Sequence, residues 1–108
     1  MSRVKISTFV PLEAADVVRQ ALGQVGAGVI GDYRFCSFSV QGTGRYLPEN
    51  GAKPYRGKNG IPSEEAEERI EVVCNQADAK QAVAAIKQAH PYEEPAIDIV
   101  PLIDEEDL

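Results

Sequence analysis

One short segment near the carboxyl end of the chain holds the side chains best suited to bind a metal ion, His90, Glu93 and Glu94. An imidazole nitrogen with carboxylate oxygens three and four residues away suits zinc, copper or nickel. Pro91 and Pro95 stiffen the same segment into a tight turn, where polar side chains can hydrogen-bond the carbonyl groups at a helix end. The segment therefore predicts either a divalent-metal site or a structural corner between a helix and a strand, and we favour the corner.

A second candidate site is the glycine-rich segment of residues 41–65. Structureless connections of this length are uncommon in compact domains and tend to be functional. Glycines let a ligand approach the backbone, and basic side chains can hold an anion. The residues that would form such an anion or nucleotide site are Gly42, Thr43, Gly44, Arg45, Lys53 and Arg56. Because neither the P-loop spacing nor a Gly-x-Gly-x-x-Gly motif is present, we prefer the alternative that the segment packs on a neighbouring subunit.

Catalytic machinery is hard to assemble from these residues. The chain has one histidine, His90, as a possible base for a serine nucleophile, and no motif marks a third residue that would orient it. The cysteines, Cys36 and Cys74, show neither a Cys-x-x-Cys nor a Cys-His spacing, which removes the strong zinc signatures. We expect no catalytic residues, and two reduced thiols that pack in the core as small hydrophobic side chains.

The overall charge and hydropathy exclude two further classes of protein. A net charge of −6 argues against a general nucleic-acid-binding protein, because that role requires an excess of lysine and arginine. No apolar run approaches the roughly 20 residues that cross a bilayer, and the first residues lead into an alternating pattern rather than a signal peptide. We therefore expect no membrane contact and a cytoplasmic protein.

The candidate sites must be positioned by strands and amphipathic helices that the hydrophobic pattern predicts. Residues 4–10 alternate in polarity, which predicts a strand with one apolar face. A helix follows from residue 12, and Gly26 and Gly28 end it as a left-handed cap requires. The apolar stripe expected on this helix is Ala14, Val17, Val18, Ala21, Leu22 and Val25.

A hairpin is predicted next, from residues 33–40 and their antiparallel partner, residues 67–74. The core-directed residues expected on these strands are Cys36, Phe38, Val40, Ile70, Val72 and Cys74. Acidic residues on the second of these strands, Glu67, Glu68 and Glu71, are interpreted as solvated or edge-strand charges.

The carboxyl-terminal third predicts one more helix and one more strand. Apolar residues at helical spacing predict a helix over residues 79–89, with Asp78 and Gln81 as a capping box. Pro91 forces His90 out of helical geometry and ends this helix. Residues 96–102 supply the last strand, and the acidic residues 104–108 are a solvated tail.

The order strand, helix, strand, strand, helix, strand predicts an α+β, ferredoxin-like βαββαβ fold in a single domain of residues 1–103. Right-handed crossovers give it a four-stranded antiparallel sheet with both helices on one face. The opposite face stays uncovered and carries apolar residues, which a monomer rarely tolerates. We therefore predict self-association through the open sheet face.

Several separate motifs, in the same order along the chain, resemble those of a known family. They are Ala27-Gly28-Val29-Ile30-Gly31-Asp32-Tyr33, Cys36-Ser37-Phe38-Ser39, Gly42-Thr43-Gly44, Pro48, Gly51-Ala52, Pro54-Tyr55, Gly57, Glu71 and His90-Pro91-Tyr92-Glu93-Glu94-Pro95-Ala96-Ile97-Asp98-Ile99. Over residues 4–102 the chain resembles the central inserted domain of the Ngg-interacting-factor-three-like proteins (the YqfO group). The His-Pro-Tyr-Glu motif alone also resembles the CutA divalent-cation tolerance proteins.

The resemblance implies a CutA-like and PII-like architecture, whose members are trimers packed through their sheets, so a trimer is the favoured assembly. It also implies that the family's dinuclear metal site, carried on flanking domains, has no counterpart in this stand-alone domain. We therefore expect a non-catalytic, oligomeric binding or regulatory module whose ligand is unidentified, a small anion being one option. The alternatives are a divalent-metal-binding protein that uses the His90 turn, with the metal as its cofactor, and, least favoured, a nucleotide-handling hydrolase.

Overall fold

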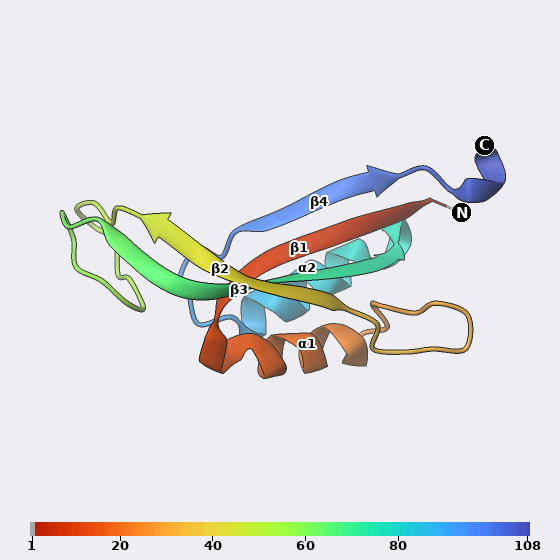
Figure 1. Cartoon of the computed structure of the whole chain (residues 1–108), viewed down its shortest axis with the longest axis horizontal. Helices are drawn as coiled ribbons and strands as arrows, with labels where there is room; N and C mark the ends of the chain where they lie inside the picture. Colours follow the sequence, from red (N-terminus) through yellow and green to blue (C-terminus); the bar gives the residue numbers. More distant parts are fainter. Residues whose placement is uncertain (1) are drawn as a thin grey trace.

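The computed structural model describes residues 2–108, which form one antiparallel sheet with two helices on one of its faces (Figure 1). The strands are β1 (Arg3–Pro11), β2 (Phe38–Tyr46), β3 (Ser63–Asn75) and β4 (Ile97–Leu102), in the order β2-β3-β1-β4. The helices are α1 (Ala15–Gln24) and α2 (Ala79–Ala89), and the 3-10 turns are η1 (Leu12–Ala14), η2 (Gln76–Asp78) and η3 (Glu105–Asp107). The predicted ferredoxin-like fold is confirmed.

The core lies between the sheet and the two helices. The alternation of β1 places its even-numbered residues toward the helices, and the register pairs Ile6 with Val72 and Thr8 with Ile70, so β3 presents its core residues on the same face. Buried side chains at the centre of this layer are Val4, Ile6, Val10, Val18, Leu22, Ile70, Val72, Ala82 and Ile86. Each large aliphatic side chain among them contributes ~1.5–3 kcal/mol by leaving water.

Helix α1 packs through a narrower stripe than the sequence predicted. Ala15, Val18 and Leu22 are buried, but Val17 is 56% exposed, so its predicted place in the apolar stripe was wrong. A helix that contacts the sheet along one line buries only the residues three and four positions apart, and Val17 lies beside that line. The predicted cap is confirmed, because Gly26 has a φ of 88° and the amide of Ala27 donates to the carbonyl of Leu22.

The start of the second strand was predicted wrongly. Residues 33–37 are not in a strand, and β2 begins at Phe38. Tyr33 closes a tight turn by exchanging backbone hydrogen bonds with Ile30, and Phe35 has a φ of 58°, which no strand residue adopts. Cys36 consequently lies in this loop and is half-buried, whereas Cys74 is buried in the core as expected.

The face assignment of β2 is also the reverse of the prediction. Ser39 pairs with the buried Ile70 and therefore faces the helices, whereas Phe38 and Val40 lie on the open face and are 63% and 42% exposed. Strand residues alternate between faces, so a strand that is read one residue out of step exchanges its whole core face for its solvent face.

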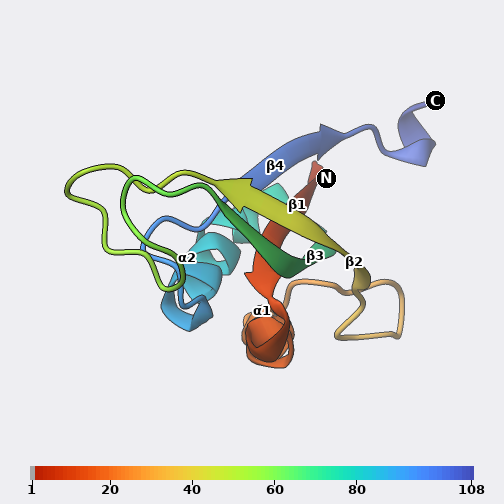
Figure 2. The ribbon, with the colours of Figure 1, turned by 60° about the vertical axis from the view of Figure 1, so that its left-hand side comes forward.

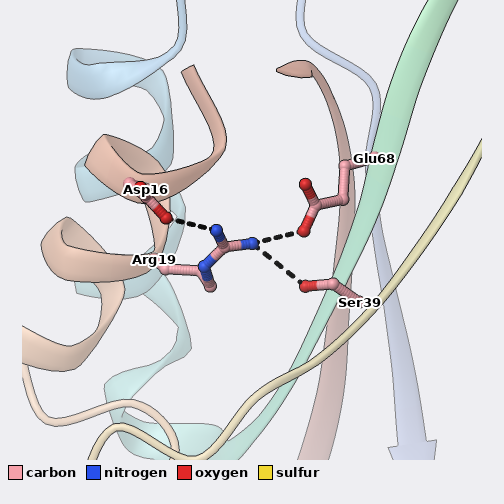
Figure 3. Close-up of polar contacts among 4 residues, drawn as sticks. All are labelled: Asp16, Arg19, Ser39 and Glu68. Atoms are coloured by element: carbon pink, nitrogen blue, oxygen red, sulfur yellow. Dashed lines mark hydrogen bonds and ion pairs between the residues drawn. The ribbon is translucent and has the colours of Figure 1, made fainter. Parts of the chain in front are cut away.

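A polar cluster takes the place of an apolar contact between α1 and β2. Arg19 donates to the hydroxyl of Ser39 over 3.2 Å and forms ion pairs with Asp16 on its own helix and Glu68 on β3 (Figure 3). Side-chain exposures of 28% for Arg19 and 14% for Glu68 show that their pair is partly removed from water. This cluster holds the first helix against the β2–β3 side of the sheet.

Helix α2 has the bounds that the sequence predicted. His90 follows it with φ −78° and ψ 132°, as expected for a residue before proline. The predicted capping box was wrong, because the side chain of Asp78 makes no capping hydrogen bond. Asp78 itself has helical backbone angles, since the 3-10 turn Gln76–Asp78 runs directly into α2 and leaves no extended residue to act as a cap.

The β2–β3 hairpin is longer, and its loop shorter, than the sequence suggested. Residues 41–46 and 63–65, expected to be loop, extend the two strands, and residues 47–62 connect them. Figure 2 shows this loop at one end of the hairpin, beside the segment that follows α2. Within residues 2–108, no helix is both long and apolar enough to span a membrane.

Candidate ligand-binding cavity

A cavity of about 680 Å3 lies between the hairpin, its loop and the corner that follows α2. Its volume is within the ~300–1,000 Å3 typical of small-molecule sites. Strands β2 and β3 form one wall, the loop forms a second and the residues after His90 form a third. The side chains with the most distinctive chemistry in its lining are Tyr46, Tyr55, Tyr92, Glu67, Glu93 and Glu94.

His90 lies behind this cavity as a structural residue of the corner. It is 5% exposed, its Nε2 atom lies 2.7 Å from the carbonyl oxygen of Phe9, and its Nδ1 atom lies 3.1 Å from the backbone nitrogen of Tyr92. A carbonyl can only accept and an amide can only donate, so the ring is neutral with its proton on Nε2. Burial lowers the pKa of His90, which agrees with this state.

This geometry bears on the metal site predicted for His90, Glu93 and Glu94. A metal ion requires a free nitrogen lone pair, and the lone pair of Nδ1 already accepts a hydrogen bond. Glu93 accepts a hydrogen bond from the backbone amide of Lys53 over 2.6 Å. Among residues 2–108, no three or more His, Cys, Asp or Glu side chains gather as a metal site would need. The arrangement favours the structural corner, and the metal site stays a prediction.

Tyr92 reaches from the corner to a carboxylate on β3. Its hydroxyl donates to Oε2 of Glu67 over 2.6 Å, and Glu67 is only 8% exposed. Burial, followed by the hydrogen bond to Glu67, raises the pKa of the Tyr92 hydroxyl far above its ordinary value. Tyr92 therefore remains a hydrogen-bond donor at every physiological pH. The interpretation of Glu67 as a solvated charge was wrong, because Tyr92 covers it.

Three tyrosines form an aromatic cluster in the cavity wall. The ring of Tyr92 lies 6.2 Å from that of Tyr46 and 6.1 Å from that of Tyr55, at interplanar angles of 59° and 45°. Tilted pairs at these separations are favourable arrangements of aromatic rings. The hydroxyl of Tyr46 donates to the carbonyl of Arg56 over 2.8 Å, so the strand and the loop are joined through this cluster.

The loop of residues 47–62 is fastened at several points. The amide of Gly60 donates to the carbonyl of Pro48 over 2.7 Å, which closes the base of the loop. The amide of Lys53 donates to Glu93 of the corner, and the hydroxyl of Tyr55 donates over 3.1 Å to Glu13 near the start of α1. The loop is thereby held over the cavity by contacts with two other parts of the chain.

The structure brings most of the predicted loop residues to this cavity. Gly42, Thr43, Gly44, Arg45 and Arg56 line it, together with Glu93 and Glu94 of the corner. Lys53 is not part of the lining, and its backbone amide donates to Glu93 of the corner. The sequence did not reveal the Tyr92–Glu67 pair, because the partners are 25 residues apart and no spacing rule connects them.

Comparison with curated proteins finds longer relatives that match most of the chain, although no family model matches it. The chain is 44% identical over 104 residues to a Halalkalibacterium halodurans protein named GTP cyclohydrolase 1 type 2 homolog, covering 96% of the chain and 28% of that protein. A Mycobacterium tuberculosis protein of the same name is 47% identical over 95 residues, covering 88% and 25%. The chain therefore spans about a quarter of the length of these relatives.

Solved structures agree with both the sequence matches and the fold. A Bacillus cereus protein related to NIF3 superposes with a TM-score of 0.84 at 39% identity, covering 95% of the chain and 26% of that protein. The periplasmic divalent cation tolerance protein CutA of Archaeoglobus fulgidus has a TM-score of 0.71 at 17% identity, covering 94% and 85%. GlnK of Bacillus subtilis has a TM-score of 0.65 at 15% identity, covering 94% and 86%. At such identities, the last two show a shared fold.

Proposed function

Because the chain belongs to the NIF3-related (YqfO) family over the segment that it spans, we propose that it is a non-catalytic, oligomeric binding or regulatory module. The cavity between the hairpin and the corner is its ligand site. The observation that carries this proposal is the arrangement of the cavity, which combines three tyrosine rings with convergent polar groups on a ferredoxin-like scaffold. Pockets of mostly apolar lining with a few placed polar groups are typical of small-molecule sites.

The state of His90 supports a binding role over a catalytic one. It is the chain's single histidine, and both of its ring nitrogens are engaged by the backbone. A general base needs a nitrogen that can take a proton from a substrate in the cavity. The hydrolase activity suggested by the name of the longer relatives therefore stays the least favoured proposal for this chain.

Self-association through the open face of the sheet is the second part of the proposal. Phe38 and Val100 lie on that face and are 63% and 51% exposed, and the register places them on the side away from the helices. Apolar residues that gather on one uncovered face mark an interaction surface. A trimer of this chain is the assembly that we favour. The cytoplasmic location of the protein remains a separate prediction.

Mass measurement and ligand screening together test the proposed function. Light scattering after gel filtration should give about three times the 11.7 kDa mass of the chain. The variant Phe38→Glu should shift the protein to a smaller species, and Val17→Glu, at a similarly exposed position on α1, should not. A thermal-shift screen with small molecules of positive, negative and zero charge should find at least one compound class that stabilises the chain. A monomer that binds none of them would contradict the proposal.

A further inference from the structure

The basic side chains of the cavity are each paired with a carboxylate. Three arginines line it, and each forms an ion pair with a carboxylate that lies outside the lining. The pairs are Arg45 with Glu64 at 3.1 Å, Arg69 with Glu71 at 3.9 Å, and Arg56 with Glu13. Because each positive charge faces a partner outside, the arginines contribute little net positive potential to the interior.

The acidic side chains of the cavity, in contrast, have no basic partner among the described residues. Glu67, Glu93 and Glu94 line it, and among residues 2–108 none of them has a lysine or arginine within ion-pair distance. Glu67 is the strongest candidate for a cationic partner among the three. It is 8% exposed, and its Oε2 atom accepts a hydrogen bond from the hydroxyl of Tyr92. A carboxylate removed from water is stabilised by a positive partner, and it can accept about four hydrogen bonds.

The aromatic rings complete the same electrostatic pattern. The faces of Tyr46 and Tyr92 carry negative quadrupole charge, and cations are attracted to such faces within ~6 Å. The ring of Tyr55 already has a cation over it, because the guanidinium of Arg56 lies 5.3 Å from its centroid. Aromatic rings next to a carboxylate form a surface suited to an ammonium group, whereas a phosphate would be repelled by both. The unpaired carboxylates and the free ring faces of the lining therefore favour positive charge.

We infer that the cavity binds an organic cation of the alkylamine class, with an ammonium group against Glu67 and the alkyl chain along the rings of Tyr46 and Tyr92. This inference rests on the proposed function and replaces the anionic ligand that the loop sequence suggested with a ligand of opposite charge. The unused acceptor positions of Glu67 favour an ammonium with N–H donors over a fully alkylated one.

Titration calorimetry with matched variants tests the inference. The probes are 1,4-diaminobutane, spermidine, tetramethylammonium, inorganic phosphate and ATP, each at two salt concentrations. The wild-type chain should bind the two amines, and Glu67→Gln should weaken amine binding by about tenfold or more, because a charge-assisted contact is lost. Glu106→Gln, which removes one charge from the exposed tail, is the matched control and should leave binding unchanged. If Glu67→Gln does not fold, Glu94→Gln at an exposed position replaces it.

Each contrary result has a distinct meaning. Equal weakening in Glu67→Gln and Glu106→Gln, or none in either, would mean diffuse attraction to an acidic protein and would overturn the inference. Binding of ATP or phosphate without amine binding would also overturn it, while the proposed binding function would stand. Amine binding that is lost in Glu67→Gln and kept in Glu106→Gln is the expected result. Failure of all five probes would reject the alkylamine ligand, and the proposed function would then be decided by the wider screen and the measured mass.

Discussion

The imidazole of His90 donates a hydrogen bond of 2.7 Å to the carbonyl oxygen of Phe9, a residue 81 positions earlier in the chain. This bond joins the end of α2 to the end of β1 at the back of the cavity. The same ring accepts the amide of Tyr92 and so fixes the direction in which the tyrosine leaves the corner. The histidine therefore positions the donor that reaches Glu67.

Replacing His90 with alanine should destabilise the fold. The substitution leaves the carbonyl of Phe9 and the amide of Tyr92 without their partner, which costs ~1–3 kcal/mol for each buried group. Urea denaturation would measure the change in the free energy of unfolding. Gln88→Ala, at an exposed position of α2, is the control and should stay within ~0.5 kcal/mol of wild type. A fully stable His90→Ala variant would refute the structural role.

The stability of the protein should depend on pH through His90. Burial holds the pKa of His90 in the folded chain below its ordinary value of about 6.5, so the unfolded chain binds more protons as the pH falls through that region. The free energy of unfolding should therefore be highest above about pH 7 and should decline from about pH 6.5 downward, before most carboxylates titrate. Urea denaturation from pH 8 to pH 5 tests this. The decline should be absent in His90→Ala, and an identical slope in both proteins would assign it to other groups.

Divalent metals should not bind through His90. The Nδ1 lone pair would have to give up the amide of Tyr92 before it could coordinate an ion. Calorimetric titration with zinc, copper and nickel should show no stoichiometric site that differs between the wild type and His90→Ala. A tight site that disappears in this variant would establish the metal-binding alternative instead.

Removal of the Tyr92 hydroxyl should be costly. Tyr92→Phe takes away a hydrogen bond to the buried carboxylate of Glu67, for which we expect a loss of ~1–3 kcal/mol in the free energy of unfolding. Tyr55→Phe is a matched control, because it removes a hydroxyl that contacts the exposed Glu13 and should change stability by less than ~0.5 kcal/mol. Equal losses in the two variants, measured by urea denaturation, would mean that Glu67 is not held by Tyr92.

Two glycines of β2 provide a test within a single strand. A Cβ atom on Gly44 would lie 2.0 Å from Oε1 of Glu67, whereas one on Gly42 would have no neighbour within 4 Å. Glu67 is buried and bonded to Tyr92, so it cannot move aside without losing that bond. Gly44→Ala should therefore cost ~1–3 kcal/mol, and Gly42→Ala should be neutral or slightly stabilising. Thermal and urea denaturation of both variants would show this difference, and a neutral Gly44→Ala would mean that the carboxylate is mobile.

The elements with the strongest local signals were predictable from sequence. The bounds of α2 follow from apolar residues at helical spacing and from Pro91, and β1 follows from strict alternation. The start of β2 was not predictable in this way. Its aromatic residues favour a strand, yet Phe35 packs so closely on Gly23 that any side chain there would collide with its ring, and this tertiary contact overrides local propensity.

The candidate site was predictable in its location and not in its electrostatics. The glycine-rich segment and the proline corner do meet, but Arg45 and Arg56 suggested an anion because a sequence does not reveal which carboxylates neutralise them. The burial of Glu67 depends on Tyr92, which comes from a different element. Charges in a sequence can be counted, whereas their pairing is a property of the fold.

The loop of residues 47–62 has a further consequence for recognition. Long connections usually lose conformational entropy when a ligand orders them, and that loss weakens binding. Here the hydrogen bonds from Gly60 to Pro48 and from Lys53 to Glu93 hold the loop in place in the folded chain. A ligand of the proposed site would meet a wall that is already in place, so most of the free energy of its contacts would be expressed as affinity.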